Sequence, residues 1–70
     1  MKIVYSKDVD AIYIELLPDK AKESDAISDD VIVDYNDEGK IVGIEILNAS
    51  KYIDISKPLE VDNMMVLANR

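Results

Sequence analysis

The sequence predicts an α+β fold that is mostly antiparallel β: a small meander of about four strands from two hairpins, with one or two short helical segments in the C-terminal part. Two pairs of short runs rich in β-branched residues, each joined by a polar turn, predict the hairpins. Partial helical periodicity near the C-terminus predicts the helical segments. Seventy residues are enough for one domain, so we expect residues 1–70 to form a single small domain.

The first hairpin is expected from residues 2–6, KIVYS, and residues 11–17, AIYIELL. The second run alternates, which places large apolar side chains on one face and a mixed set on the other. The apolar set is Ile12, Ile14 and Leu16, and the mixed set is Ala11, Tyr13 and Glu15. Pro18 ends the run because proline has no N–H to donate to a neighbouring strand.

Residues 19–30, DKAKESDAISDD, are polar and weakly patterned. They fit either a loop or an edge strand centred on Ala26 and Ile27. Lys20 and Lys22 would suit an edge, since charged side chains there oppose pairing with other chains. The sequence leaves both alternatives open.

The second hairpin joins residues 31–35, VIVDY, to residues 41–47, IVGIEIL. The segment between them, NDEGK, predicts a type I turn with Gly39 in the left-handed conformation. Counting back from this turn places Val33 opposite Gly43. Both faces of the hairpin are then apolar, although an antiparallel hairpin in a small protein normally has one face in water.

A second copy of the chain is the simplest cover for the extra apolar face, so we expect a homodimer with a two-fold contact. The residues expected at this interface are Tyr13, Val33, Tyr35, Ile41 and Gly43. Gly43 would permit a close approach of the two chains.

The C-terminal part allows two interpretations. Residues 48–54, NASKYID, fit a short helical turn with Asn48 or Ser50 as N-cap. Residues 58–70 match the helical template at four apolar positions and favour a helix weakly, while the Asp-Asn pair at 62–63 would suit a hairpin turn. The four positions are Val61, Met64, Met65 and Ala68.

Composition excludes several classes of function. The chain has neither cysteine nor histidine, which removes disulfides, zinc-thiolate sites and the commonest general base. Its 15 acidic and 8 basic residues give a net charge of -7, which opposes binding to nucleic acid and to anionic membranes. No apolar run is long enough to span a membrane, and the first ten residues lack the apolar region of a signal peptide, so we expect a cytoplasmic protein.

Residues 34–45, DYNDEGKIVGIE, have nearly the spacing of an EF-hand calcium loop, with Gly39 at the turn and Glu45 at the closing position. An EF-hand needs helices on both sides, and these flanks are typical of strands. In a strand, Glu45 would lie about 20 Å beyond the turn, too far to close a cage with Asp34 and Asn36. We therefore expect a hairpin with no metal site and no cofactor.

Carboxylates could also support hydrolysis. The candidates are Asp29, Asp30, Asp34 and Glu45. Such chemistry needs a concave pocket, which a chain of this length rarely encloses alone, so we assign no catalytic residue. The four tyrosines could stack on single-stranded nucleic acid, but that platform needs a basic groove, and we expect them at a sheet rim or an interface instead.

Two segments together resemble a known family of small, mostly prokaryotic proteins. They are YSKDVDAIYIEL, residues 5–16, and DDVIVDYNDEGKIVGIEILNASK, residues 29–51. The family is catalogued as domain of unknown function 2283. The matching positions are Asp10, Ala11, Tyr13, Ile14, Leu16, residues 31–35, Gly39, residues 43–47, Ala49 and Ser50.

The resemblance implies no established activity and no agreed catalytic residues. It also implies a role as a partner of other small proteins, some of them toxin-like. We therefore expect an uncharacterised, non-enzymatic module that binds proteins or regulates them in an antitoxin-like way. The alternatives are a carboxylate-based site for a divalent cation and a hydrolase assembled across subunits.

Overall fold

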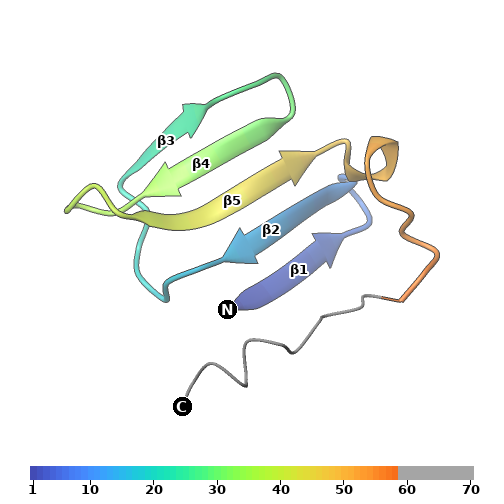
Figure 1. Cartoon of the computed structure of the whole chain (residues 1–70), viewed down its shortest axis with the longest axis horizontal. Helices are drawn as coiled ribbons and strands as arrows, with labels where there is room; N and C mark the ends of the chain where they lie inside the picture. Colours follow the sequence, from blue (N-terminus) through green and yellow to red (C-terminus); the bar gives the residue numbers. More distant parts are fainter. Residues whose placement is uncertain (59–70) are drawn as a thin grey trace, which may run out of the picture.

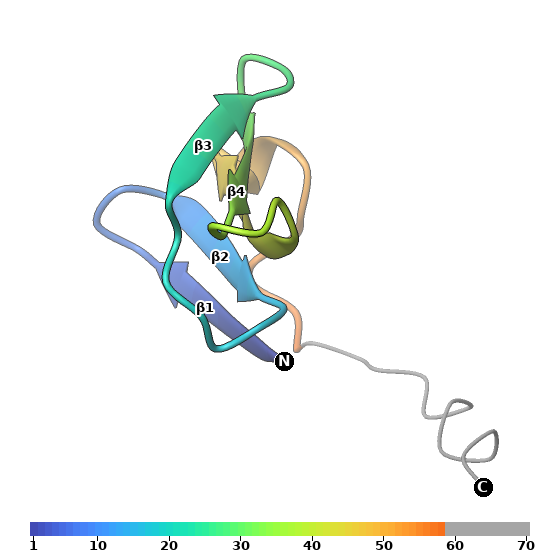
Figure 2. The ribbon, with the colours of Figure 1, turned by 90° about the vertical axis from the view of Figure 1, so that its left-hand side faces the viewer.

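The computed structural model describes residues 1–58, which form one antiparallel sheet of five strands (Figure 1). The strands are β1 (Lys2–Ser6), β2 (Ala11–Glu15), β3 (Glu23–Ala26), β4 (Val31–Tyr35) and β5 (Ile41–Leu47), followed by the 3-10 turn η1 (Ala49–Lys51). Figure 2, turned by 90°, shows the strands in one twisted layer. The strand order is β1-β2-β5-β4-β3.

The α+β prediction is wrong: residues 1–58 contain five strands, no α-helix and a single 3-10 turn. The expected turn at 48–54 contributes only these three helical residues. Asn48 precedes them in the left-handed conformation, with φ of 52° and no capping hydrogen bond from its side chain. The helix considered for residues 58–70 lies almost wholly outside the described residues.

The four-stranded meander is also wrong, because residues 23–26 form a fifth strand at the sheet edge. Backbone pairing with β4 fixes this strand, and the N–H of Lys22 extends it by donating to the Tyr35 carbonyl at 2.7 Å. Strands β3, β4 and β5 are consecutive, and β2 lies beside β5. This is a Greek-key order, in which residues 16–22 connect β2 to the far edge.

The first hairpin has the predicted faces. Strand β1 pairs with β2 so that Ile3 lies opposite Ile14 and Tyr5 lies opposite Ile12. Because side chains alternate along a strand, these four residues share one face of the sheet. Strand β5 continues this face, since Ile12 and Ile14 lie opposite Ile46 and Ile44.

The register predicted for the second hairpin is wrong by one residue beyond the turn. Tyr35 lies opposite Ile41 as expected, but Asp34 lies opposite Gly43, and Val42 is an extra residue in β5. The carbonyl of Val42 accepts the backbone N–H groups of Leu16 and Leu17, at 2.8 and 3.2 Å. This β-bulge exchanges the faces of β5 relative to the prediction.

The hairpin therefore has one apolar face rather than two. The apolar face of the sheet is defined by Ile3, Tyr5, Ile12, Ile14, Val31, Val33, Tyr35, Ile41, Ile44 and Ile46. The opposite side, the mixed face, is defined by Val4, Tyr13, Glu15, Ser24, Ile32, Asp34, Gly43 and Glu45. One layer of strands gives a small core, in which the buried apolar residues are Ile12, Val33, Val42 and Ala49.

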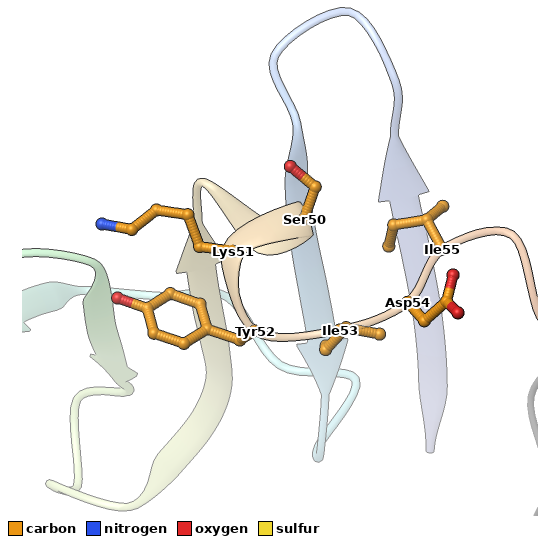
Figure 3. A pocket seen from close by; sticks show the side chains of 6 residues that line it. All are labelled: Ser50, Lys51, Tyr52, Ile53, Asp54 and Ile55. Carbon is orange, nitrogen blue, oxygen red and sulfur yellow. The ribbon is translucent and has the colours of Figure 1, made fainter.

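Part of the apolar face is covered by residues 52–55, which we call the strap. Figure 3 shows the strap crossing the sheet, with Ile53 in front of β2 and Ile55 in front of β1. A hollow of about 360 Å³ lies beneath it, lined by residues that include Ile3, Tyr5 and Ile55. No helix within residues 1–58 is long and apolar enough to cross a membrane.

Candidate functional site

The loop with calcium-like spacing is a hairpin turn, as predicted. Gly39 has a φ of +80°, the left-handed region that favours glycine. The side-chain oxygen of Asn36 accepts the backbone N–H groups of Glu38 and Lys40, both at 2.9 Å, which closes the turn from inside. The Asn36 amide donates to Asp19 at 2.9 Å and so ties the turn to the β2–β3 connection.

A carboxyl pair nevertheless forms on the mixed face, and here the sequence argument about distance was wrong. Asp34 lies back along β4, opposite Gly43, so Glu45 is its diagonal neighbour on β5. Asp34 is only 4% exposed and also accepts the Ser24 hydroxyl at 2.5 Å. The hydrogen bond to Asp34, burial and the nearby negative charge raise the pKa of Glu45.

Tyr13 lies directly over Gly43 on the same face. A Cβ atom at position 43 would come within 2.5 Å of Cζ and 2.8 Å of Cε1 of the Tyr13 ring, and nearer still to its hydroxyl oxygen. Burial raises the pKa of the Tyr13 phenol, and the charges of the carboxylates around it add to this effect. Gly43 therefore makes room for Tyr13 of its own chain.

Asp30 joins the end of the sheet to η1 and the strap. Its carboxylate accepts hydrogen bonds from the Asn48 amide at 2.9 Å, from the Lys51 ammonium at 3.2 Å and from the Tyr52 hydroxyl. These hydrogen bonds lower the pKa of Asp30 to about 2, and the one from Tyr52 has the largest effect. The sequence offered Asp30 as a candidate hydrolytic acid, and the structure places its carboxylate in a junction of three hydrogen bonds.

Asp10 makes a second junction, between the β1–β2 turn and η1. It accepts the Ser50 hydroxyl at 2.7 Å and the Tyr5 hydroxyl at 3.1 Å, and its carbonyl accepts the Ala49 N–H at 2.9 Å. The hydrogen bond from Ser50 is the main cause that lowers the pKa of Asp10. Sequence reasoning missed this junction. The available signal was a pair of short segments rich in polar residues, KDVD at 7–10 and NAS at 48–50, that flank apolar runs.

The five residues predicted at an interface lie on two different faces. Val33, Tyr35 and Ile41 belong to the apolar face, whereas Tyr13 and Gly43 belong to the mixed face. Val33 is 6% exposed, and Ile41 is 42% exposed. The structure therefore does not combine the five residues into one surface.

The carboxyl pair lies outside the hollows of the described surface. Three shallow hollows on the described surface lie beside β3, along η1 and the strap, and beneath the strap, and neither Asp34 nor Glu45 lines any of them. Within residues 1–58 no group of three acidic residues is placed to hold a metal ion. The most extensive feature is the apolar face, of which the strap covers only one end.

The structure defines a small single-sheet β protein whose polar junctions hold its turns together. Residues 2–50 match the family described as a protein of unknown function (DUF2283), and the chain belongs to this family. It is also 37% identical, over 57 residues and 81% of its length, to an uncharacterized protein of Methanocaldococcus jannaschii. The chain spans 48% of the length of that relative. No solved structure is significantly similar to the chain.

Proposed function

We propose that the chain is a non-enzymatic protein-binding module and that its binding surface is the part of the apolar face that residues 1–58 leave uncovered. The observation that carries this proposal is a single layer of strands with large apolar side chains on one side and a strap over only one end of them. Contiguous apolar surface of this kind marks interaction sites in soluble proteins. The family match and the uncharacterized relative are consistent with this role without specifying it.

The partner we propose is a protein with an apolar patch bordered by lysine or arginine. At the β3 border of the apolar face, the alternation of side chains places Glu23 and Asp25 beside Tyr35 and Val33. The whole chain carries a net charge of -7, so a basic border would approach it favourably. An antitoxin-like regulatory role is the special case in which binding blocks the activity of that partner.

The carboxyl pair does not favour a hydrolase or a cation site over this proposal. Asp34 is buried and accepts the Ser24 hydroxyl, and Glu45 is its diagonal neighbour on β5. They form part of the mixed face, where they join β4 to β5 and β3.

Capture from an extract of the source cells tests the proposal. Wild-type chain is compared with Ile41→Lys, which places a charge on the apolar face, and with Ile27→Lys, which places the same charge on an exposed loop residue. We expect to capture a protein from the extract that binds wild type and Ile27→Lys but not Ile41→Lys. The captured protein, once purified, should show the same preference. A captured protein that binds all three equally, or none at all, would contradict the proposal.

A further inference from the structure

The two edges of the sheet differ in their protection against pairing with another strand. Strand β3 is short and carries Glu23 and Asp25, which discourage pairing. Strand β1 has five residues, no proline and no acidic side chain, and every residue in it is exposed. Within residues 1–58 its backbone pairs only with β2, so the outer N–H and C=O groups of β1 have no backbone partner there.

Charge is also distributed unequally between the half of the sheet that ends in β1 and the half that ends in β3. Residues 1–15 and 48–58, which form β1, β2, η1 and the strap, carry four acidic and four basic side chains. Residues 16–47, which form β3, β4 and β5, carry nine acidic and three basic side chains. Two copies of this acidic protein can therefore approach through their β1 edges without the repulsion that their β3 edges would meet.

We propose that β1 pairs antiparallel with β1 of a second copy, which joins two five-stranded sheets into one sheet of ten strands. The inference goes beyond the proposed function, because it uses the backbone edge of β1 and leaves the binding surface around Ile41 free. A two-fold axis at Val4 gives a closed contact that cannot extend into a fibre.

The side chains of β1 suit this register. Val4 lies opposite Val4 of the other copy, Ile3 opposite Tyr5, and Lys2 opposite Ser6, so no like charges face each other. The two residues of each pair are an even number of positions apart, so both direct their backbone groups toward the same edge. Pairs of aromatic and β-branched residues are among the favourable cross-strand contacts.

Pairing in this register also makes the apolar faces of the two copies continuous. Ile3 and Tyr5 both belong to the apolar face, and both line the hollow beneath the strap. In the dimer the two hollows lie on either side of the new seam.

Light scattering with charge-exchange variants tests the pairing on the full chain. Val4 is 43% exposed, so Val4→Lys places like charges at the two-fold axis without filling the core, while Ala26→Lys places the same charge on the other edge. Wild type and Ala26→Lys should show twice the single-chain mass of 7.9 kDa, and Val4→Lys should raise the dimer dissociation constant about tenfold. Mixing Val4→Lys with Val4→Glu should restore the dimer.

A cysteine trap gives a second readout that does not depend on charge. The chain has no cysteine, so Val4→Cys creates a lone thiol that forms a disulfide with another copy only if the two Cβ atoms lie close together. Mild oxidation should trap Val4→Cys quickly and the exposed-loop variant Ile27→Cys slowly. A wild-type mass of 7.9 kDa at roughly 100 µM, or equal trapping rates, would overturn the pairing while leaving the binding role of the apolar face standing.

Discussion

Replacing Gly43 by alanine tests the packing of the mixed face, because the outcome should depend on the residue at position 13. A Cβ atom at position 43 would lie 2.5 Å from Cζ of Tyr13, well inside van der Waals contact, so the ring must move. Forced overpacking of this kind costs about 1–3 kcal/mol. The φ of Gly43 is not positive, so alanine itself fits the backbone and would contribute about 0.4–1 kcal/mol by restricting the unfolded chain.

The net effect of Gly43→Ala should be a loss of about 1–2 kcal/mol, which lowers the Tm by roughly 4–16 °C in a domain of this size. Tyr13→Val keeps a residue that favours strands in β2, but the valine side chain does not reach Gly43. In that background Gly43→Ala should raise stability slightly instead of lowering it. The difference between the two backgrounds is the coupling between the two positions.

Urea unfolding followed by circular dichroism gives the four free energies of this double-mutant cycle. Equal effects of Gly43→Ala in the two backgrounds would refute the packing argument. They would mean that Tyr13 does not occupy the space above Gly43 in solution.

Three further predictions concern single residues. Asp30 has its pKa lowered from 3.8 to about 2 in the folded chain, so the stability it contributes is present above pH 3.8 and is lost as the pH falls through about 2; the urea midpoint of Asp30→Asn should vary less over this range than that of wild type. Glu45 has a raised folded pKa, so its ionisation at neutral pH opposes folding, and Glu45→Gln should raise the Tm at pH 7 but not below its ordinary pKa of 4.5; a gain of equal size at both pH values would contradict the raised pKa. Gly39→Val should cost about 1–2 kcal/mol in thermal unfolding because φ is positive there, and Gly39→Asn should cost less; equal Tm values for both variants and wild type would place the turn elsewhere.

The two hairpins and the turn at Gly39 were predictable because their signals are local. Runs of β-branched residues favour strands, and the NDEG segment favours a left-handed glycine at one position. The bulge at Val42 was not predictable, since it depends on hydrogen bonds from Leu16 and Leu17, which lie more than twenty positions away. Missing that one residue reversed the predicted faces of β5 and produced the expectation of two apolar faces.

Strand β3 and the polar junctions illustrate the same limit. The sequence of β3, ESDA, has little intrinsic preference for a strand, and pairing with β4 fixes its conformation. Asp10 contacts Ser50 across 40 positions, and Asp30 contacts Tyr52 across 22. In the sequence these residues look like ordinary turn formers, because their partners become visible only when the sheet brings distant segments together.

The most direct test of the central claim is methyl NMR of the purified chain with a soluble paramagnetic probe, before and after addition of the captured protein. We expect the probe to broaden the signals of Ile41 and Ile44 in the chain alone, and we expect the captured protein to shield both residues from the probe. The signal of Ile27, which is exposed outside both faces, should be broadened equally in the two samples. Signals of Ile41 and Ile44 that stay broadened when the captured protein is bound would contradict the claim that the apolar face is the binding surface.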